Sequence, residues 1–95
     1  QKQYSPKTKV LLNQKKYIAG TACLGFGKPP IAFRDCKHIF NLSLSENLFE
    51  ASHLLYEGLR YLDKLDLKFI QVLPIPSIGI GKALNDRLKR ASFNE

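Results

Sequence analysis

Two glycine-containing turns come nearest to a phosphate-binding site in this sequence. They read Gly25-Phe26-Gly27-Lys28 and Gly79-Ile80-Gly81-Lys82. Neither completes the P-loop pattern G-x-x-x-x-G-K-[ST] or the dinucleotide-binding pattern G-x-G-x-x-G. Gly79 and Gly81 lie between an expected strand and an expected helix, where backbone N–H groups could bind an anion. The alternative role of these two glycines is structural, and we favour it because free N–H groups occur at every helix start.

The histidines and cysteines do not form a catalytic or metal-binding pattern. His38 and His53 have no cysteine or carboxylate at the spacing of a nucleophile or a metal ligand. Cys23 and Cys36 are too few for a disulfide framework, and we expect reduced, buried thiols of a cytosolic protein. The sequence therefore predicts no catalytic residue and no metal site, as in a scaffold or regulatory domain.

A long amphipathic helix over residues 47–65 is the element around which the chain is organised. Its apolar residues recur at steps of three and four, at Leu48, Ala51, Leu55, Leu59 and Leu62. Its polar side carries Glu50, Glu57, Arg60, Asp63 and Lys64. Asn47 and Glu50 match a capping box, with Ser43 and Glu46 as a competing start.

Short apolar segments on either side of this helix predict strands. They cover residues 9–13, 21–26, 37–42 and 68–73, with a second helix over 81–91 that carries an Asp86–Arg90 pair. Residues 16–20 are a further short strand or a connecting arm, and residues 31–33 are briefly extended.

The alternation of strands and helices predicts an α/β fold, with a small Rossmann-like, mostly parallel sheet covered by helices. The link between residues 13 and 21 is too short for a helical crossover, which needs about a dozen residues. We therefore expect the first two strands to pair as a hairpin or to be joined by an arm over the sheet edge.

Length and charge limit the classes of function. Ninety-five residues form one domain, and no apolar run approaches the ~20 residues that span a bilayer. The net charge of +7 suggests a free-standing basic RNA-binding module as an alternative function. A solvated basic face is the simpler interpretation, since no RNA-binding signature accompanies the charge. The chain begins with Gln and has no Met, which indicates a piece of a longer protein.

The end of the chain resembles a known family. A proline-bounded strand over residues 69–76 precedes the Gly79-Ile80-Gly81 turn and the helix sequence Asn85-Asp86-Arg87-Leu88-Lys89-Arg90-Ala91. This order is similar to the C-terminal accessory domain of L-threonylcarbamoyladenylate synthase, and residues 41–63 resemble the central helix of that domain. Tyr4-Ser5-Pro6-Lys7 looks like the end of the linker to the catalytic domain. The resemblance covers most of the chain from Asn41 onward.

The resemblance implies a cytoplasmic parent enzyme, a nucleotidyltransferase of tRNA processing. That enzyme makes threonylcarbamoyl-AMP and pyrophosphate from threonine, bicarbonate and ATP, and its product supplies threonylcarbamoyladenosine in tRNA. The implied partner of this chain is an N-terminal catalytic domain, which would bind ATP and magnesium. The fragment itself would need no cofactor and no membrane, would be inactive alone, and would have only an indirect link to tRNA.

The resemblance also assigns residues. Residues 1–7 would be the end of the linker and residues 8–95 the accessory domain. Tyr4 would contact substrate over the ATP site, and residues 1–6 should be mobile in the isolated domain because nothing obvious holds them. Structural or docking roles fall to Asn85, Asp86, Arg87 and Arg90. A degenerate dinucleotide-binding domain is a weaker alternative, since no acid follows a complete glycine fingerprint by ~20 residues.

Overall fold

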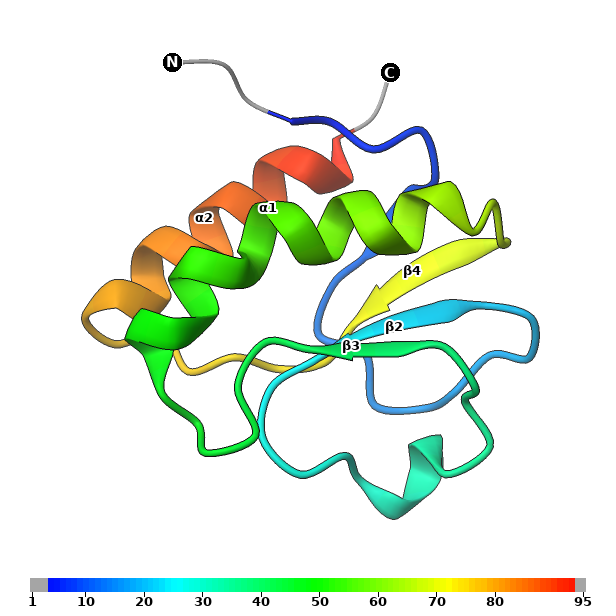
Figure 1. Ribbon diagram of the computed structural model, residues 1–95, viewed down its shortest axis with the longest axis horizontal. Coiled ribbons are helices and arrows are strands. Elements are labelled where there is room, and N and C mark those ends of the chain that lie inside the picture. The colour runs from blue at the N-terminus through cyan, green and yellow to red at the C-terminus, as the bar shows by residue number, and fades with distance from the viewer. Residues whose placement is uncertain (1–3, 94–95) are drawn as a thin grey trace.

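The computed structural model describes residues 4–93 of the chain (Figure 1). It has four strands, β1 (Lys9–Leu11), β2 (Ala22–Gly25), β3 (Ile39–Asn41) and β4 (Phe69–Val72). Two helices, α1 (Leu48–Lys64) and α2 (Ile80–Ser92), flank β4 in the sequence, and a short 3-10 helix, η1 (Ile31–Phe33), precedes β3. None of the helices in this part of the chain is long and apolar enough to cross a membrane.

The four strands form one parallel sheet in the order β1-β4-β2-β3. β4 lies between β1 and β2, with Ile70 opposite both Val10 and Ala22. The predicted α/β fold with a small parallel sheet is therefore confirmed, and the two long helices begin and end within a residue or two of the predicted bounds. This agreement follows from the strong apolar periodicity of both helices.

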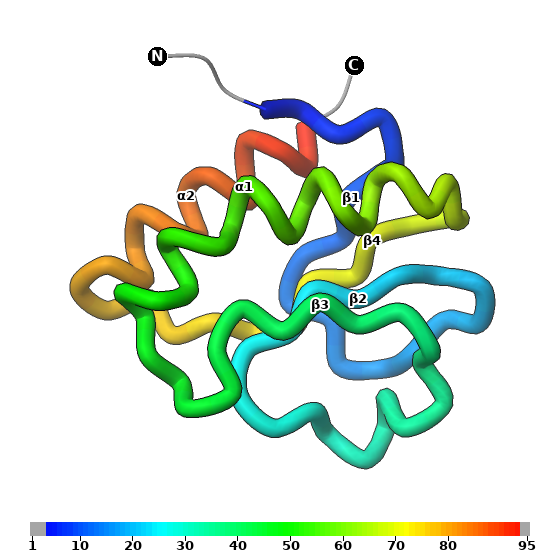
Figure 2. The backbone as a smooth tube through the Cα atoms, viewed as in Figure 1, coloured from blue at the N-terminus to red at the C-terminus, as the bar shows by residue number. Residues whose placement is uncertain are grey.

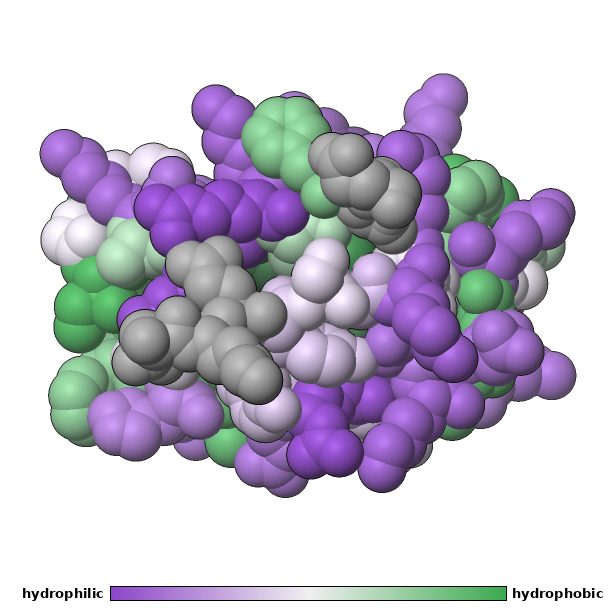
Figure 3. All heavy atoms as spheres, turned by 90° about the horizontal axis from the view of Figure 1, so that it is seen from above, coloured by the Kyte–Doolittle hydropathy of each residue, from purple (hydrophilic) through white to green (hydrophobic). Residues whose placement is uncertain are grey.

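Both helices lie on the same face of the sheet (Figures 1 and 2). α1 packs over β2 and β3, and α2 packs over β1. The main core lies between the helices and the sheet, and it includes Leu24, Leu59, Leu62, Ile70 and Leu84. Figure 3 shows that the outer surface of this side is mostly hydrophilic, as expected where amphipathic helices face water.

The opposite face of the sheet is covered by irregular segments and η1 instead of helices. A second, smaller core there contains Cys23, Phe33 and Leu73. The hairpin predicted for the first two strands is wrong, because β1 and β2 are parallel to β4 and do not pair with each other. The link over residues 12–21 crosses this face of the sheet and forms no strand, so residues 16–20 are the connecting arm that was the alternative to a further strand.

A single side chain explains why this link needs no helix. Gln71 of β4 is fully buried and points away from the helices. Its amide makes four hydrogen bonds, accepting from Ile18 N (3.0 Å) and Thr21 Oγ1 (2.8 Å) and donating to Gln14 Oε1 (3.0 Å) and Lys16 O (2.7 Å). These bonds use the full capacity of the amide, and two of them give partners to backbone groups of the link, Lys16 O and Ile18 N.

The helix α1 begins after Asn47, one of the two predicted caps, and not at the competing Ser43–Glu46 start. Asn47 is the N-cap, and its side chain accepts from Glu50 N (3.0 Å). The Glu50 carboxylate does not return to Asn47, because it accepts instead from Ser43 Oγ (2.6 Å), which in turn accepts from Asn47 N (2.9 Å). Ser43 thus makes the bond to Asn47 N that the capping box expected from Glu50.

Residues 31–33, which were expected to be extended, form η1.

Candidate functional site

The Gly79–Gly81 turn has a structural explanation. Gly79 has a positive φ of 51°, which L side chains rarely adopt. A Cβ atom at Gly81 would overlap the carbonyl oxygen of Pro76, so only glycine fits this close approach. Gly81 N donates to Ile78 O (2.7 Å) and Lys82 N donates to Gly79 O (3.1 Å), so two of the N–H groups are used locally. Anion binding at this turn remains a prediction.

Asn85 joins α2 to the segment that precedes it. Its Nδ2 donates to Ile75 O (2.8 Å) and to Ser77 Oγ (2.7 Å). The two bonds hold the proline-bounded segment after β4 against the first half of α2. A structural role is therefore visible for Asn85 in the described residues, although its side chain also borders a hollow of about 180 Å³ beside Leu12 and Lys89.

Asp86 and Arg90 form an ion pair on the exposed flank of α2. Arg90 Nη2 lies 2.8 Å from Asp86 Oδ2, and each side chain is 55% exposed. This is the i,i+4 pair that the sequence indicates. Because both groups are in contact with water, the pair contributes little to the free energy of unfolding.

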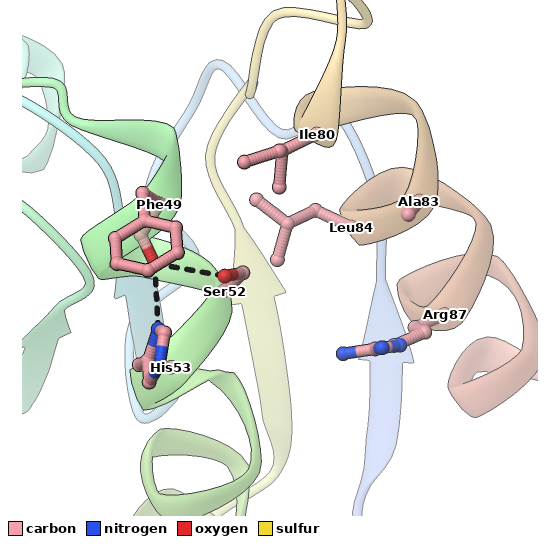
Figure 4. Close-up of a pocket in the computed structure, with 7 residues that line it drawn as sticks. All are labelled: Phe49, Ser52, His53, Ile80, Ala83, Leu84 and Arg87. Carbon is pink, nitrogen blue, oxygen red and sulfur yellow. Dashed lines mark hydrogen bonds between the residues drawn. The ribbon is translucent and has the colours of Figure 1, made fainter.

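Arg87 borders a shallow hollow between the first turns of α1 and α2 (Figure 4). The hollow has a volume of about 290 Å³ and is lined by Phe49, Ser52, His53, Ile80, Ala83, Leu84 and Arg87. His53 Nδ1 lies 3.1 Å from Phe49 O, and Ser52 Oγ donates to the same carbonyl (2.8 Å). With these two polar groups bonded to the backbone of their own helix, the hollow offers an apolar surface beside one guanidinium group and no catalytic pair.

The structure brings the N-terminal segment to a buried carboxylate that sequence reasoning missed. Asp63, only 8% exposed, lies near the end of α1. Its Oδ2 accepts from Tyr4 OH (2.5 Å) and Lys7 N (3.2 Å), and its Oδ1 accepts from Thr8 N (2.9 Å) and Thr8 Oγ1 (2.7 Å). We call this arrangement the Asp63 anchor. The Tyr4 ring also packs edge-on against Tyr56, with 5.3 Å between the ring centroids.

The Asp63 anchor corrects two predictions. Asp63 was placed on the solvated side of the helix, but it continues the buried row Ala51–Leu55–Leu59 at the same spacing of four residues. This spacing was the sequence signal from which the burial of Asp63 could have been predicted. The N-terminal segment was expected to be mobile, whereas Tyr4, Lys7 and Thr8 are held on α1. Residues 1–3 of that segment lie outside the described part of the chain.

The electrostatics of the anchor fix its protonation states. Burial raises the pKa of Asp63, but the hydrogen bonds from Tyr4 and Thr8 and from the Lys7 amide outweigh burial and hold this pKa below its usual value. Burial first, and then the hydrogen bond to Asp63, raise the pKa of Tyr4 to about 12. The anchor is therefore an ionised carboxylate bonded to a neutral phenol across the neutral pH range.

The sequence-predicted site residues do not come together. Gly81 lies near Leu48 at the start of α1, whereas Tyr4 binds Asp63 near its end. Fifteen residues of helix separate these two points, or about 22 Å at ~1.5 Å per residue. Residues 4–93 contain no cluster of three or more side chains that could hold a metal ion. The structure thus has a place that holds the N-terminal segment and, at the other end of α1, an apolar hollow.

Comparison with known proteins identifies one family. The family model described as "Threonylcarbamoyl-AMP synthase, C-terminal domain" matches residues 1–92. This match includes both helices, all four strands and the segment that Asp63 holds. A search of curated proteins finds no match to the chain.

Proposed function

Because the chain belongs to the family of threonylcarbamoyl-AMP synthase C-terminal domains, we propose that it is the accessory domain of such an enzyme. In this proposal, threonine, bicarbonate and ATP react on a separate N-terminal catalytic domain, and the product is used for tRNA modification. The present chain supplies no reacting group. It binds the catalytic domain and fixes one end of the linker that joins the two domains.

The observation that supports this role is the Asp63 anchor. In the proposed enzyme, the linker reaches this domain through Tyr4, and the next residues are bonded to α1 by a carboxylate whose four acceptor positions are all used. Charge-assisted bonds of this kind are stronger than neutral ones. The linker therefore meets the domain at a fixed point and in a fixed direction.

A fixed linker end has consequences for catalysis on the partner domain. Holding residues 4–8 on α1 shortens the freely moving part of the linker, which raises the effective concentration of one domain near the other. It also limits the positions that the linker can take over the ATP site. Segments that close over an active site affect turnover as well as binding, so loosening the anchor should lower kcat.

Tyr4 has two roles that must be distinguished. With its hydroxyl on Asp63, Tyr4 holds the linker, and any effect of Tyr4 on catalysis passes through Asp63. Alternatively, Tyr4 leaves Asp63 and contacts substrate directly over the ATP site. The first role predicts that removing the Tyr4 hydroxyl has no further effect once Asp63 is replaced, while the second predicts an effect of Tyr4 alone on KM for ATP.

The test uses the full-length protein that carries this domain and measures pyrophosphate released from ATP in the presence of threonine and bicarbonate. We expect Asp63→Asn and Tyr4→Phe each to lower kcat several-fold, and the double variant to be no worse than Asp63→Asn. Asp66→Asn is the matched control, because Asp66 is exposed and its positive φ of 55° suits Asn.

Two results would contradict the proposal. One is wild-type turnover in the Asp63→Asn variant, which would make the anchor irrelevant to catalysis. The other is pyrophosphate release by the purified 95-residue chain, which would show that the accessory domain has an active site of its own.

A further inference from the structure

Two free thiols meet on the side of the sheet away from the helices. Cys36 Sγ lies 2.9 Å from Cys23 Sγ, and no disulfide joins them. The two residues are 13 positions apart in the sequence. To form a disulfide, the sulfur atoms would approach by about 0.9 Å, from 2.9 Å to the ~2.05 Å of an S–S bond.

The backbone holds both cysteines in place. Cys23 lies in β2, and its N–H donates to His38 O (2.8 Å). Cys36 follows η1, and its N–H donates to Phe33 O (3.0 Å). Phe33 is 1% exposed in the smaller core, so the turn that carries Cys36 is fixed by a buried ring. The short distance between the sulfurs is thus a property of the fold around them.

The two thiols differ in access to solvent. Cys23 is fully buried, whereas Cys36 is only partly buried. Burial, together with the hydrogen bond from Cys36, raises the pKa of the Cys23 thiol. A reagent dissolved in water therefore meets Cys36 first, and Cys23 lies directly behind it.

We propose that Cys23 and Cys36 are a modification site, at which a low-molecular-weight disulfide such as oxidised glutathione converts the two thiols into a reversible intradomain disulfide. The observations that carry the proposal are the contact between the sulfurs, the fixed backbone on both sides and the accessibility of one partner.

The exchange takes place in two balanced steps. The thiolate of Cys36 attacks one sulfur of oxidised glutathione, forms a mixed disulfide and releases one glutathione thiolate. Cys23 then gives its proton to solvent and attacks Cys36 Sγ, which breaks the mixed disulfide and releases the second glutathione thiolate. The two released thiolates take up protons. In total, two protein thiols are oxidised and one glutathione disulfide is reduced to two glutathione thiols.

The bond would close a loop that contains η1 and the first glycine turn. Closing a loop of this length restricts the unfolded chain, so the oxidised domain should melt at a higher temperature than the reduced one. It would fasten η1 to β2 and leave the helix side of the sheet unchanged, where the Asp63 anchor lies.

The test equilibrates the 95-residue chain in glutathione buffers of graded redox potential, with and without denaturant. Acid quenching, alkylation and intact mass then count the free thiols. We expect the native chain to lose both thiols together, without a glutathione adduct, and to form the bond at least tenfold more favourably than the denatured chain. The oxidised chain should melt on the order of 10 °C higher.

Variants separate the outcomes. Cys23→Ala should stop at a stable glutathione adduct on Cys36, and Cys36→Ser should resist modification, because the remaining Cys23 is buried. Three results would overturn the proposal. They are a lasting mixed disulfide in the wild-type chain, a bond that forms only in denaturant, or a lower melting temperature after oxidation.

Discussion

Asp63 on α1 and Gln71 on β4 both attach an irregular segment to the fold, the first with a charged side chain and the second with a neutral one. Each is a buried polar side chain in a regular element, each makes four hydrogen bonds, and each holds an irregular segment against the fold. Asp63 is charged and accepts all of its bonds, whereas Gln71 is neutral, donates two and accepts two. Gln71 holds residues 14–21 inside the domain, and Asp63 holds the N-terminal segment.

This difference indicates which attachment can be released. The bonds of Gln71 join neutral groups and do not depend on protonation, so the segment across the sheet is a permanent part of the fold. The bonds of Asp63 depend on its charge, because all four donors face an ionised carboxylate. An attachment of the second kind suits the proposed function, in which the segment is the end of a linker that must be positioned and still permit motion.

The largest loss of stability should follow from replacing the neutral amide of Gln71 by a carboxylate like that of Asp63. Gln71→Glu removes both donors and places a carboxylate against Lys16 O and Gln14 Oε1, fully buried. We expect the free energy of unfolding to fall by about 3–5 kcal/mol at neutral pH, the usual cost of an unpaired buried charge. Urea denaturation measures this free energy, and a loss below about 1 kcal/mol would show that residues 14–21 do not depend on the bonds of Gln71.

The reverse exchange should cost less. Asp63→Asn keeps the shape of the side chain but replaces one acceptor oxygen by an NH₂ group that faces N–H and O–H donors. We expect a loss of about 2 kcal/mol, since the N-terminal segment can detach and return its polar groups to water. The same urea experiment compares this variant with Asp66→Asn, for which no change is expected. Equal losses for Asp63→Asn and Gln71→Glu would remove the distinction between the two anchors.

Acid and alkali should weaken the Asp63 anchor and leave the bonds of Gln71 unchanged. The lowered pKa of Asp63 means that its contribution is present above about pH 4 and is lost as pH falls through the folded pKa. The pKa of Tyr4 is raised from 10.0 to about 12, so the contribution of Tyr4 is present below pH 10 and is lost as pH rises toward 12.

The measurement is the stability difference between wild type and Asp63→Asn across pH. It should be constant between about pH 5 and 9 and should shrink at both extremes. The corresponding difference for Gln71→Leu, a variant with no titrating group, should stay flat across the same range. A flat profile for Asp63 as well would show that its charge contributes nothing to the anchor.

The smallest effect belongs to the exposed pair on α2. Asp86→Ala removes one partner of an ion pair that is 55% exposed on each side, so we expect a change of at most about 1 kcal/mol. Thermal denaturation measures it, with Arg90→Ala as the matched variant. If the Asp86→Ala domain folds normally but binds the catalytic domain less tightly, Asp86 has the docking role that its position suggests. A loss of stability as large as that of Asp63→Asn would contradict the expectation that this exposed ion pair contributes less than the Asp63 anchor.

Sequence patterns predicted the regular elements of this fold better than the attachments between them. The apolar rows of α1 and α2 and the strand at Phe69–Val72 were sufficient to predict the helices and the parallel sheet. The path of residues 12–21 was not predictable, because it depends on bonds to Gln71, which lies more than fifty positions away in the sequence. A polar residue in the middle of an apolar strand was the one local sign of this.

The candidate site shows the same limit. The glycine pattern correctly marked the turn before α2, but the close approach to Pro76 that requires Gly81 appears only in three dimensions. Asp63 was classed by its charge and not by its place in the row of Leu55 and Leu59. Charged residues are seldom fully buried unless paired, so the general rule favoured the wrong side of the helix.

The central claim is that Asp63 holds the end of the linker on this domain, and amide hydrogen exchange tests it most directly. Thr8 N–H donates to Asp63, while Ile18 N–H donates to Gln71, so one experiment reports on both anchors. We predict that both amides are protected in the wild-type chain and that Asp63→Asn speeds exchange of Thr8 at least tenfold while Ile18 is unchanged. Exchange of Thr8 at the rate of an unstructured peptide in the wild-type chain would contradict the account.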